Sequence, residues 1–533
     1  MPLPAGNEVW PPPALDPVTT QLAVWSAWYS SDLDAISALY GGPTAGDPAR
    51  GNASAQNAAR DSWRLRIGRT IARWFWGTPT PATEKRTKLH LPIARDIAST
   101  SADLLFGEPP TFTVEATETQ ARLDELTGSH LCATLTEAAE LCAGMGGIYL
   151  RICWDKTLRD RPWISAVHAD GAIPEWRWDA LVGVTFWREI AVDGQKVIRH
   201  LERHEPGHIL HGVYEGTATD LGKPVDLAAF PETAGLQPVI ETGTPGRLTA
   251  GYVPNMRPAP CWRHEPAGAN LGRADFDGAE PLMDALDETY SSLMRDIRLG
   301  KARLHVPAAY LESQGPGKGA LWEDRELYVP MTALGANKLD AGLQISETQF
   351  AIRVDEHLRT AADLLQRIAQ TSGYSAQTFG LQGDGGLATA TEVDARKDRT
   401  TATRAKKVNY WAPELSELAL TLQLVDKAVF GHGYTPERPD VDMGDGATES
   451  PRQIAETLEL LHRAEAASIE TKVRMLHPDW DDVRVRQEVD GIRQDSGMFD
   501  PIEAAVDDTF RRGGDPADPT QPAPTDPAVP PTE

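Results

Sequence analysis

The chain has 533 residues, of which 41% are apolar and 24% charged, so it is a globular protein too long for one compact core. Because a domain typically has about 100–200 residues, we expect three to four structural units. Lys and Arg total 52 against 77 Asp and Glu, a formal net charge of −25, which excludes a protein that holds nucleic acid through its overall field. Any contact with phosphates must therefore be local or weak.

The cysteines indicate the redox environment of the protein, and the apolar runs indicate whether it contacts a membrane. None of the four cysteines forms a CxxC pair, so we expect them to be reduced and structural: Cys132, Cys142, Cys153 and Cys261. The N-terminal MPLPAGNEVWPPP has neither a basic region nor an apolar one, so we expect no signal peptide. No apolar run reaches about 18 residues, so we expect no membrane contact.

The first half of the chain predicts an irregular arm followed by a mixed helix and strand body. Residues 1–87 read as an N-terminal arm and irregular segment, Pro-rich up to about residue 20, with one short helical patch at 25–39. A helix is expected over 91–106, because Pro92 suits its first turn and Gly107 can take a left-handed cap. A second helical stretch is expected over 117–143.

Short β-branched and aromatic runs between 146 and about 260 predict an antiparallel sheet. The glycines at 144, 146 and 147 precede a strand, whereas a phosphate-binding loop follows one, so we interpret them as a tight turn into the sheet.

The second half of the chain is mainly helical. Helices are expected over 281–299 and 351–370, with strand-like pieces and a Gly-rich loop (313–320) between them. A polar, Gly-rich loop at 371–388 precedes a long helix from about 389 to 430, in which Pro413 should produce a kink. Two further helices, around 454–475 and 483–492, precede a tail rich in Pro, Asp and Thr that we expect to be disordered.

One motif matches the HExxH signature of zinc proteases: His204, Glu205 and His208, with Pro206 and Gly207 between them. That chemistry needs both histidines one turn apart on a helix. Here both flanks alternate like strands, and Pro-Gly is typical of a turn. We therefore predict a hairpin and keep a zinc-dependent hydrolase as the alternative function.

A basic cluster stands out in this acidic chain, on the predicted long helix: Arg396, Lys397, Arg399, Arg404, Lys406 and Lys407. It contacts either DNA or a neighbouring subunit, or it is a solvated helix face paired with acidic residues at i,i+4 spacing. No Ser/His/Asp or Cys/His arrangement is identifiable. The prediction is a protein without enzymatic activity, catalytic residues, cofactor or metal.

Five stretches, in order, carry a family resemblance: 88–110, 200–216, 274–304, 389–418 and 472–492. Together they resemble the portal proteins of tailed bacteriophages of the siphophage type, the head-to-tail connector rings. The resemblance implies an α+β portal-protein fold with an α/β wing, a helical stem, a clip, a long kinked helix and an α-helical crown. It also implies a ring, commonly of about twelve subunits. Such a ring is consistent with heterologous interfaces whose rotation closes.

The resemblance divides the chain into expected parts. They are an arm (1–87), the wing body (88–278), the stem and clip (279–350), wing and tunnel helices (351–449), the crown (450–510) and a disordered tail (511–533). The loop 371–388 becomes a candidate tunnel loop facing DNA, with Gln377, Thr378, Gln382, Asp384, Gly385 and Gly386 as the candidate channel residues.

The implied function is a channel at one capsid vertex for packaging and ejecting double-stranded DNA, which passes without sequence specificity. The implied partners are the major capsid and scaffolding proteins, the terminase large subunit and a head-tail connector or adaptor protein. The location would be the virion, with assembly in the host cytoplasm. Besides the zinc hydrolase, the remaining alternative is a structural adaptor of unrelated fold.

Overall fold

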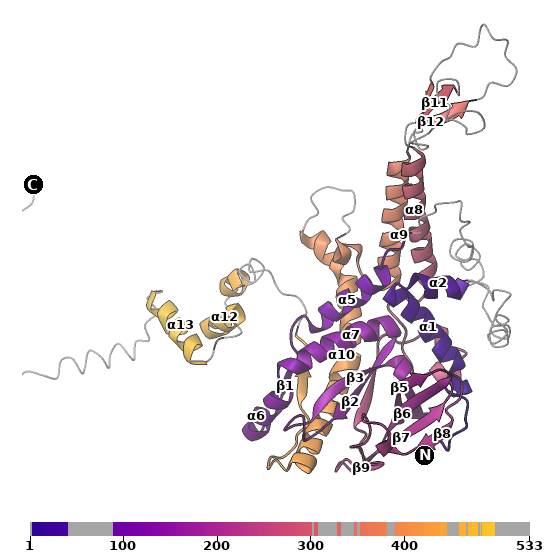
Figure 1. The fold of residues 1–533 in the computed structure, drawn as a ribbon. Coiled ribbons are helices and arrows are strands. Elements are labelled where there is room, and N and C mark those ends of the chain that lie inside the picture. Colours follow the sequence, from indigo (N-terminus) through magenta and orange to yellow (C-terminus); the bar gives the residue numbers. More distant parts are fainter. Residues whose placement is uncertain are drawn as a thin grey trace, which may run out of the picture. The chain divides into compact units, whose positions relative to one another are not determined.

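A computed structural model describes residues 3–40, 89–300, 303–307, 328–331, 346–348, 352–380, 390–444, 458–464, 467–477, 480 and 482–495. The chain divides into two compact units, Met1–Gly446 and Ala447–Glu533. The first unit contains both large apolar cores and almost all of the strands and helices (Figure 1).

The N-terminal arm is more regular than its composition predicts. After a short 3-10 turn, helix α1 spans Asp16–Ser30 and helix α2 spans Leu33–Tyr40. Trp25 and Trp28 are buried in the first core cluster, so the predicted helical patch is confirmed, although its helix begins earlier than expected. Irregular structure was predicted up to residue 20, and it holds for residues 3–12. It is wrong for the residues of α1 up to 20, because Val18 and Leu22 also pack into that core.

Three helices follow, α5 (Ile93–Phe106), α6 (Thr117–Leu126) and α7 (Ser129–Met145). The α5 prediction is confirmed, but Gly107 keeps a right-handed conformation with φ −61°, so the left-handed cap was wrong. The single helical stretch expected over 117–143 is two helices, interrupted at Thr127 and Gly128. Gly146 has φ +80° and ends α7 directly before a strand, which confirms the predicted tight turn.

The strands of the body are antiparallel, as predicted, but they form two sheets instead of the single one expected. One has the order β10-β2-β3, and the other has the order β4-β5-β6-β7-β8 with β9 also paired to β7. Their bounds are β2 Gly147–Cys153, β3 Trp163–His168, β4 Ala172–Arg177, β5 Ala180–Asp193, β6 Lys196–Glu205, β7 His208–Gly216, β8 Lys223–Val225, β9 Val239–Glu241 and β10 Ala250–Pro254. The N-terminal arm joins the β8 side, where the amide of Asn7 donates to the carbonyl of Gly222.

Helices α8 (Glu280–Leu299) and α9 (Val354–Thr371) lie side by side (Figure 1). Three short strands lie between them in the chain and form their own sheet, β11 (Arg303–Pro307), β12 (Tyr328–Met331) and β13 (Ser346–Thr348). The apolar side chains of α8 are buried at Met283 and Leu286, whereas Ile297 is exposed. The Gly-rich loop at 313–320 lies outside the described residues.

Helix α10 (Ala390–Val425) is the longest described helix and continues into a π-helical turn, Asp426–Phe430, so the predicted long helix is confirmed. Its stripe Leu415, Leu418, Leu422 and Val425 is almost fully buried within the subunit, in the second core cluster beside α5, α6 and α7. The short strand β14 (Asp440–Asp442) pairs antiparallel with β1 (Thr111–Thr113).

In the second unit, α12 (Ile469–Leu476) and α13 (Asp482–Asp495) pack around Val473, Val485 and Val489. One continuous helix over 454–475 was wrong, because Ser468 caps a new helix by accepting from the amide of Thr471. None of the helices in the described ranges has the length and apolar character that a membrane span requires.

Candidate functional site

The long helix α10 carries the predicted basic cluster, and the structure separates its members. Arg399 and Lys406 are exposed. Arg404 instead points into the subunit, where its guanidinium donates to the carbonyls of Leu104, Met443 and Gly444. Arg396 and Lys397 belong to α10, but the structure does not describe their side chains.

Lys407 is the centre of a buried polar cluster. Its Nζ lies 2.6 Å from Oδ2 of Asp275 and 3.1 Å from the hydroxyl of Tyr374, and it also donates to Ser101. The side chains of Lys407 and Asp275 are 2% and 0% exposed. Asn255 completes the cluster by donating to the other oxygen of Asp275 over 2.8 Å. Because Lys407 is buried in this way, it cannot contact DNA or a neighbouring subunit, and the prediction of such a contact is wrong for Lys407.

The same face of α10 holds the start of the candidate tunnel loop. Thr400 and Thr403 precede Lys407 by about two and one helical turns, so the three side chains share a face. The hydroxyl of Thr403 donates to the carbonyl of Gly373 over 2.6 Å, and Oγ1 of Thr400 accepts from the amide of Ser375 over 3.0 Å. Residues 373–378 are therefore docked on α10.

This docking bears on two candidate channel residues. The hydroxyl of Thr378 lies 2.9 Å from that of Thr400 and 2.9 Å from that of Ser375, so its polar group is already engaged within the subunit. Gln377 lies in the 3-10 turn η7 (Ala376–Phe379), and its Oε1 is buried without a hydrogen-bond partner among the described residues. Gln382, Asp384, Gly385 and Gly386 lie outside the described residues.

Pro413 lies inside α10 without ending it. Proline has no amide hydrogen, so the carbonyl of Asn409 receives no helical hydrogen bond from position 413. The kink that we expect there stays a prediction.

The HExxH motif is a hairpin, as predicted. Strands β6 and β7 pair in register with Glu205 opposite His208, and Gly207 has φ +87° in the turn between them. His204 is fully buried, with Nε2 donating to Glu202 over 2.8 Å and Nδ1 2.7 Å from the hydroxyl of Thr249. His208 is exposed, so the helical ligand geometry of a zinc hydrolase is absent from this motif. Within the described ranges, no group of three or more His, Cys, Asp or Glu is placed to hold a metal ion.

The hairpin carries a buried cluster of histidines and carboxylates. Nε2 of His200 lies 3.2 Å from Nδ1 of His211, and Arg151 pairs with Glu202 over 2.6 Å. Burial alone would raise the pKa of Glu202, but its hydrogen bond with His204 and the nearby Arg151 charge outweigh it and hold that pKa far below the usual range. Burial, and then the neighbouring His211, lower the pKa of His200 to about 4.

We predict that His200 makes the subunit less stable in acid. An unfolded histidine has a pKa near 6.5, so between about pH 6.5 and pH 4 the unfolded chain binds the proton that folded His200 rejects. The contribution of neutral His200 to the free energy of unfolding is on the order of 2 kcal/mol. It is present above about pH 6.5 and is lost as the pH falls toward 4. Urea unfolding at pH 7 and pH 4 should show a smaller loss for His200→Gln than for the natural chain. The exposed His208→Gln is the control, and equal losses in all three proteins would contradict the prediction.

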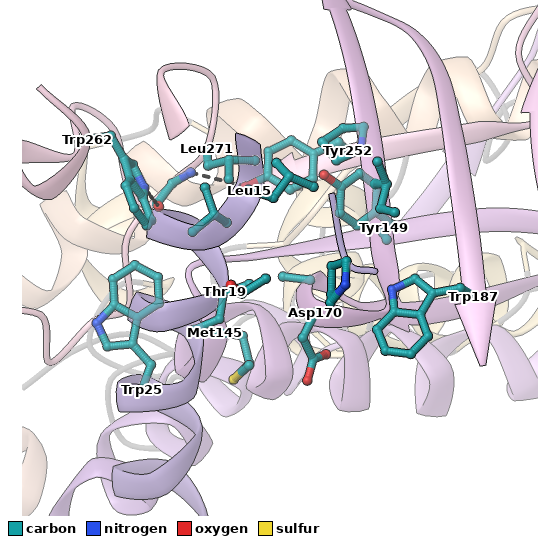
Figure 2. A pocket seen from close by; sticks show the side chains of 18 residues that line it. Leu15, Thr19, Trp25, Met145, Tyr149, Asp170, Trp187, Tyr252, Trp262 and Leu271 are labelled. Atoms are coloured by element: carbon teal, nitrogen blue, oxygen red, sulfur yellow. Dashed lines mark hydrogen bonds between the residues drawn. The ribbon is translucent and has the colours of Figure 1, made fainter. Parts of the chain in front are cut away.

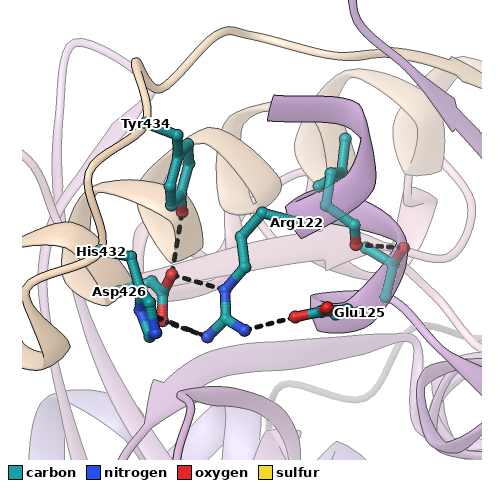
Figure 3. A network of polar contacts seen from close by, with 7 residues as sticks. Arg122, Glu125, Asp426, His432 and Tyr434 are labelled. Atoms are coloured by element: carbon teal, nitrogen blue, oxygen red, sulfur yellow. Dashed lines mark hydrogen bonds and ion pairs between the residues drawn. The ribbon is translucent and has the colours of Figure 1, made fainter. Parts of the chain in front are cut away.

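A second buried network ties the end of α10 to α6, and sequence analysis did not find it (Figure 3). The side chain of Asp426 is 0% exposed and accepts two hydrogen bonds from Arg122, of 3.0 and 2.9 Å. Tyr434 donates to the same carboxylate over 3.1 Å, and His432 lies 3.2 Å from it. The hydrogen bond and ion pair with Asp426 raise the pKa of Arg122 above its already high value. The partners are about 300 residues apart in sequence, so no local pattern indicates them.

A small cavity lies where the N-terminal arm covers the body (Figure 2). Leu15, Thr19 and Trp25 line it from the arm, and Tyr149 and Tyr252 line it from the strands. Its volume is about 30 Å³, enough for water but far below the roughly 300 Å³ that small-molecule pockets usually reach. This part of the arm therefore completes the core.

The fold is a mixed helix and sheet body with a projecting helical pair, and the buried carboxylates of Asp275 and Asp426 are paired within the subunit (Figure 1). The model of the family described as "Phage portal protein, SPP1 Gp6-like" matches residues 69–498, which is more than half of the chain. The chain therefore belongs to the SPP1 Gp6-like family of phage portal proteins. Members of that family are structural, not enzymatic, so the chain is a portal or connector component of a virus particle.

Two solved structures are also similar to the chain. The first is described as "Neck of native GTA particle computed with C12 symmetry", with 12% identity and a TM-score of 0.35 over 72% of this chain and 89% of that one. The second is "Neck of empty GTA particle computed with C6 symmetry", with 14% identity and a TM-score of 0.37 over 80% and 97%. Scores this low support no conclusion about this chain. No curated protein sequence matches it.

Proposed function

We propose that the chain assembles into a closed ring of about twelve copies at one capsid vertex, and that double-stranded DNA enters and leaves the head through this ring. The observation that carries the proposal is the portal family match over residues 69–498. The acidic charge of −25 fits the role, because a channel that gripped phosphates strongly would release DNA slowly.

The helical pair α8/α9 supports a stem within residues 279–350 and the start of α9. Apolar side chains on both helices, and Ile352 just before α9, remain at least 36% exposed in the single subunit: Met294, Ile297, Ile352, Val354 and Leu358. Exposed apolar surface of this kind is typical of a protein interface, and a ring would cover it with the neighbouring stem. The small sheet β11–β13, inserted between the two helices, is then the candidate clip.

The remaining parts follow from the same assignment. We propose the wing body at 88–278, the wing and tunnel helices at 351–449 and the crown at 450–510. The expected partners are the major capsid and scaffolding proteins, the terminase large subunit and a head-tail connector protein.

We infer that the DNA-facing part of the tunnel loop is its second half, with Gln382, Asp384, Gly385 and Gly386. The first half is less available, since Gly373, Ser375 and Thr378 are bonded to α10. Arg399 and Lys406 remain candidates for a contact with DNA or with a neighbouring subunit, because both are exposed.

We predict that positive charge in this loop slows packaging. Gln382→Lys and Asp384→Lys would add phosphate contacts, and each contact steepens the salt dependence of DNA binding by about 0.9 log units per log unit of salt. The measurement is the packaging rate in an assembled system, together with DNA binding by isolated rings at several salt concentrations. Gln195→Lys, in the exposed β5–β6 turn, is the matched control. Unchanged packaging and salt dependence in the loop variants would contradict the tunnel assignment and direct attention to the loop 313–320.

A further inference from the structure

A tryptophan is exposed at the tip of the β4–β5 hairpin. Trp178 is 92% exposed, more than any other large apolar side chain in the described ranges. Arg177 pairs with Ala180, so Trp178 and Asp179 form a two-residue turn, in which they have φ +52° and φ +62°. Such turns favour Asn, Asp and Gly, so Asp179 suits its position, whereas Trp178 is strained in the left-handed region. The chain keeps a strained backbone here and presents an indole ring to solvent, a combination that points to a binding role.

The neighbouring residue adds a cation to this tip. Arg177 is exposed, and it has no ion-pair partner in the part of the chain that the structure describes. Tryptophan and arginine are the residues most often found at the energetic centre of protein interfaces. We call Arg177 and Trp178 together the Trp178 tip.

A groove on other elements of the same subunit is complementary to this tip. It lies between α5, α9 and η7 and has a volume of about 430 Å³. Its lining is mainly apolar, with Ile93, Ile97, Leu365, Ile368 and Phe379, and the hydroxyl side chains Ser99, Thr100 and Thr378 also line it. Asp96 also lines the groove, is exposed, and has no ion pair among the described residues. An apolar groove with one free carboxylate suits an aromatic ring with one adjacent cation.

We propose that the Trp178 tip of one copy docks into the α5/α9/η7 groove of a second copy of this chain, with Arg177 paired to Asp96. The inference rests on the proposed ring, because a closed ring needs two non-identical surfaces on every subunit. The tip and the groove belong to different elements, so their contact is heterologous and repeats around the ring. The contact buries the exposed indole and neutralises two unpaired charges.

The first test separates strain from docking. Trp178→Asn places a residue suited to the left-handed turn, so the isolated subunit should unfold at the same or a higher temperature. The subunit concentration at which half of the protein is assembled should nevertheless rise at least tenfold, as measured by mass photometry. Leu158→Asn is the matched control, since Leu158 is 73% exposed on a different loop, and it should assemble like the natural chain.

The second test is a charge exchange. Arg177→Asp and Asp96→Arg should each weaken assembly, and the double variant should recover most of the loss, because it restores the pair in reversed orientation. Benzoyl-phenylalanine at position 178 should crosslink to residues 93–100 or 365–379, and mixing isotopically labelled and unlabelled chains will show that the two ends belong to different copies.

The outcomes distinguish this inference from the proposed ring. Rings of the natural chain that form equally well with Trp178→Asn and with both single charge variants would overturn the docking contact and leave the ring standing. A crosslink to the same chain, or to a different surface of the second copy, would also overturn it. Absence of any ring from the natural chain would contradict the proposed function and this inference together.

Discussion

Lys407→Met should destabilise the isolated subunit by about 3–5 kcal/mol, because it leaves a buried carboxylate without its cation. Asp275 is fully buried and would keep only the neutral donors Tyr374 and Asn255. The loss should appear as a lower midpoint in urea unfolding followed by tryptophan fluorescence. It should also loosen residues 373–378, because Tyr374 is held to the body through this cluster, and hydrogen exchange of those amides should become faster.

Two controls make this prediction specific. Lys406→Met removes the same charge from the adjacent exposed position and should change the free energy of unfolding by less than about 0.5 kcal/mol. The double variant Lys407→Met, Asp275→Asn removes both charges and should be more stable than Lys407→Met alone. Equal stability of Lys406→Met and Lys407→Met would show that the buried pair does not form.

Trp28→Ala should also destabilise the subunit by about 3–5 kcal/mol, although the residue lies before the start of the family match at residue 69. Trp28 is 1% exposed in the first core cluster, and its ring lies 5.7 Å from that of His90 on the body. Truncation to alanine removes this apolar contact and leaves a cavity between the arm and the body. Thermal unfolding by calorimetry measures the effect directly.

Trp178→Ala is the matched control for the arm, since it removes the same side chain from a position that is 92% exposed. It should leave the stability of the isolated subunit unchanged or slightly raised. If Trp28→Ala and Trp178→Ala behave alike, the N-terminal arm does not pack on the body as described.

Local patterns in the sequence predicted much of the fold. The 3–4 spacing of Leu415, Leu418 and Leu422 is typical of a buried helix face, and all three side chains are buried in the structure. Pro206 and Gly207 between alternating flanks indicated a hairpin instead of a zinc site, and the β6–β7 register confirms it. These features depend on residues close together in the chain, so periodicity and turn chemistry suffice to find them.

Features that depend on distant partners could not be predicted in the same way. Lys407 belongs to a basic run that is typical of a solvated helix face, but its partner Asp275 is 132 residues away in the sequence. The π-helical turn with Asp426 and its partner Arg122 has no local signature either. The Pro-rich start of the arm indicated irregular structure, but not that Trp10 would be buried there with its ring 5.9 Å from that of Trp187.

The central claim is that this chain forms a ring, and one measurement tests it most directly. Purified protein should be examined by negative-stain electron microscopy over a range of protein and salt concentrations, with native mass spectrometry of the same samples. We expect closed rings of about twelve copies with a central opening. Monomers alone at every concentration and salt, or open filaments without closed particles, would contradict the claim.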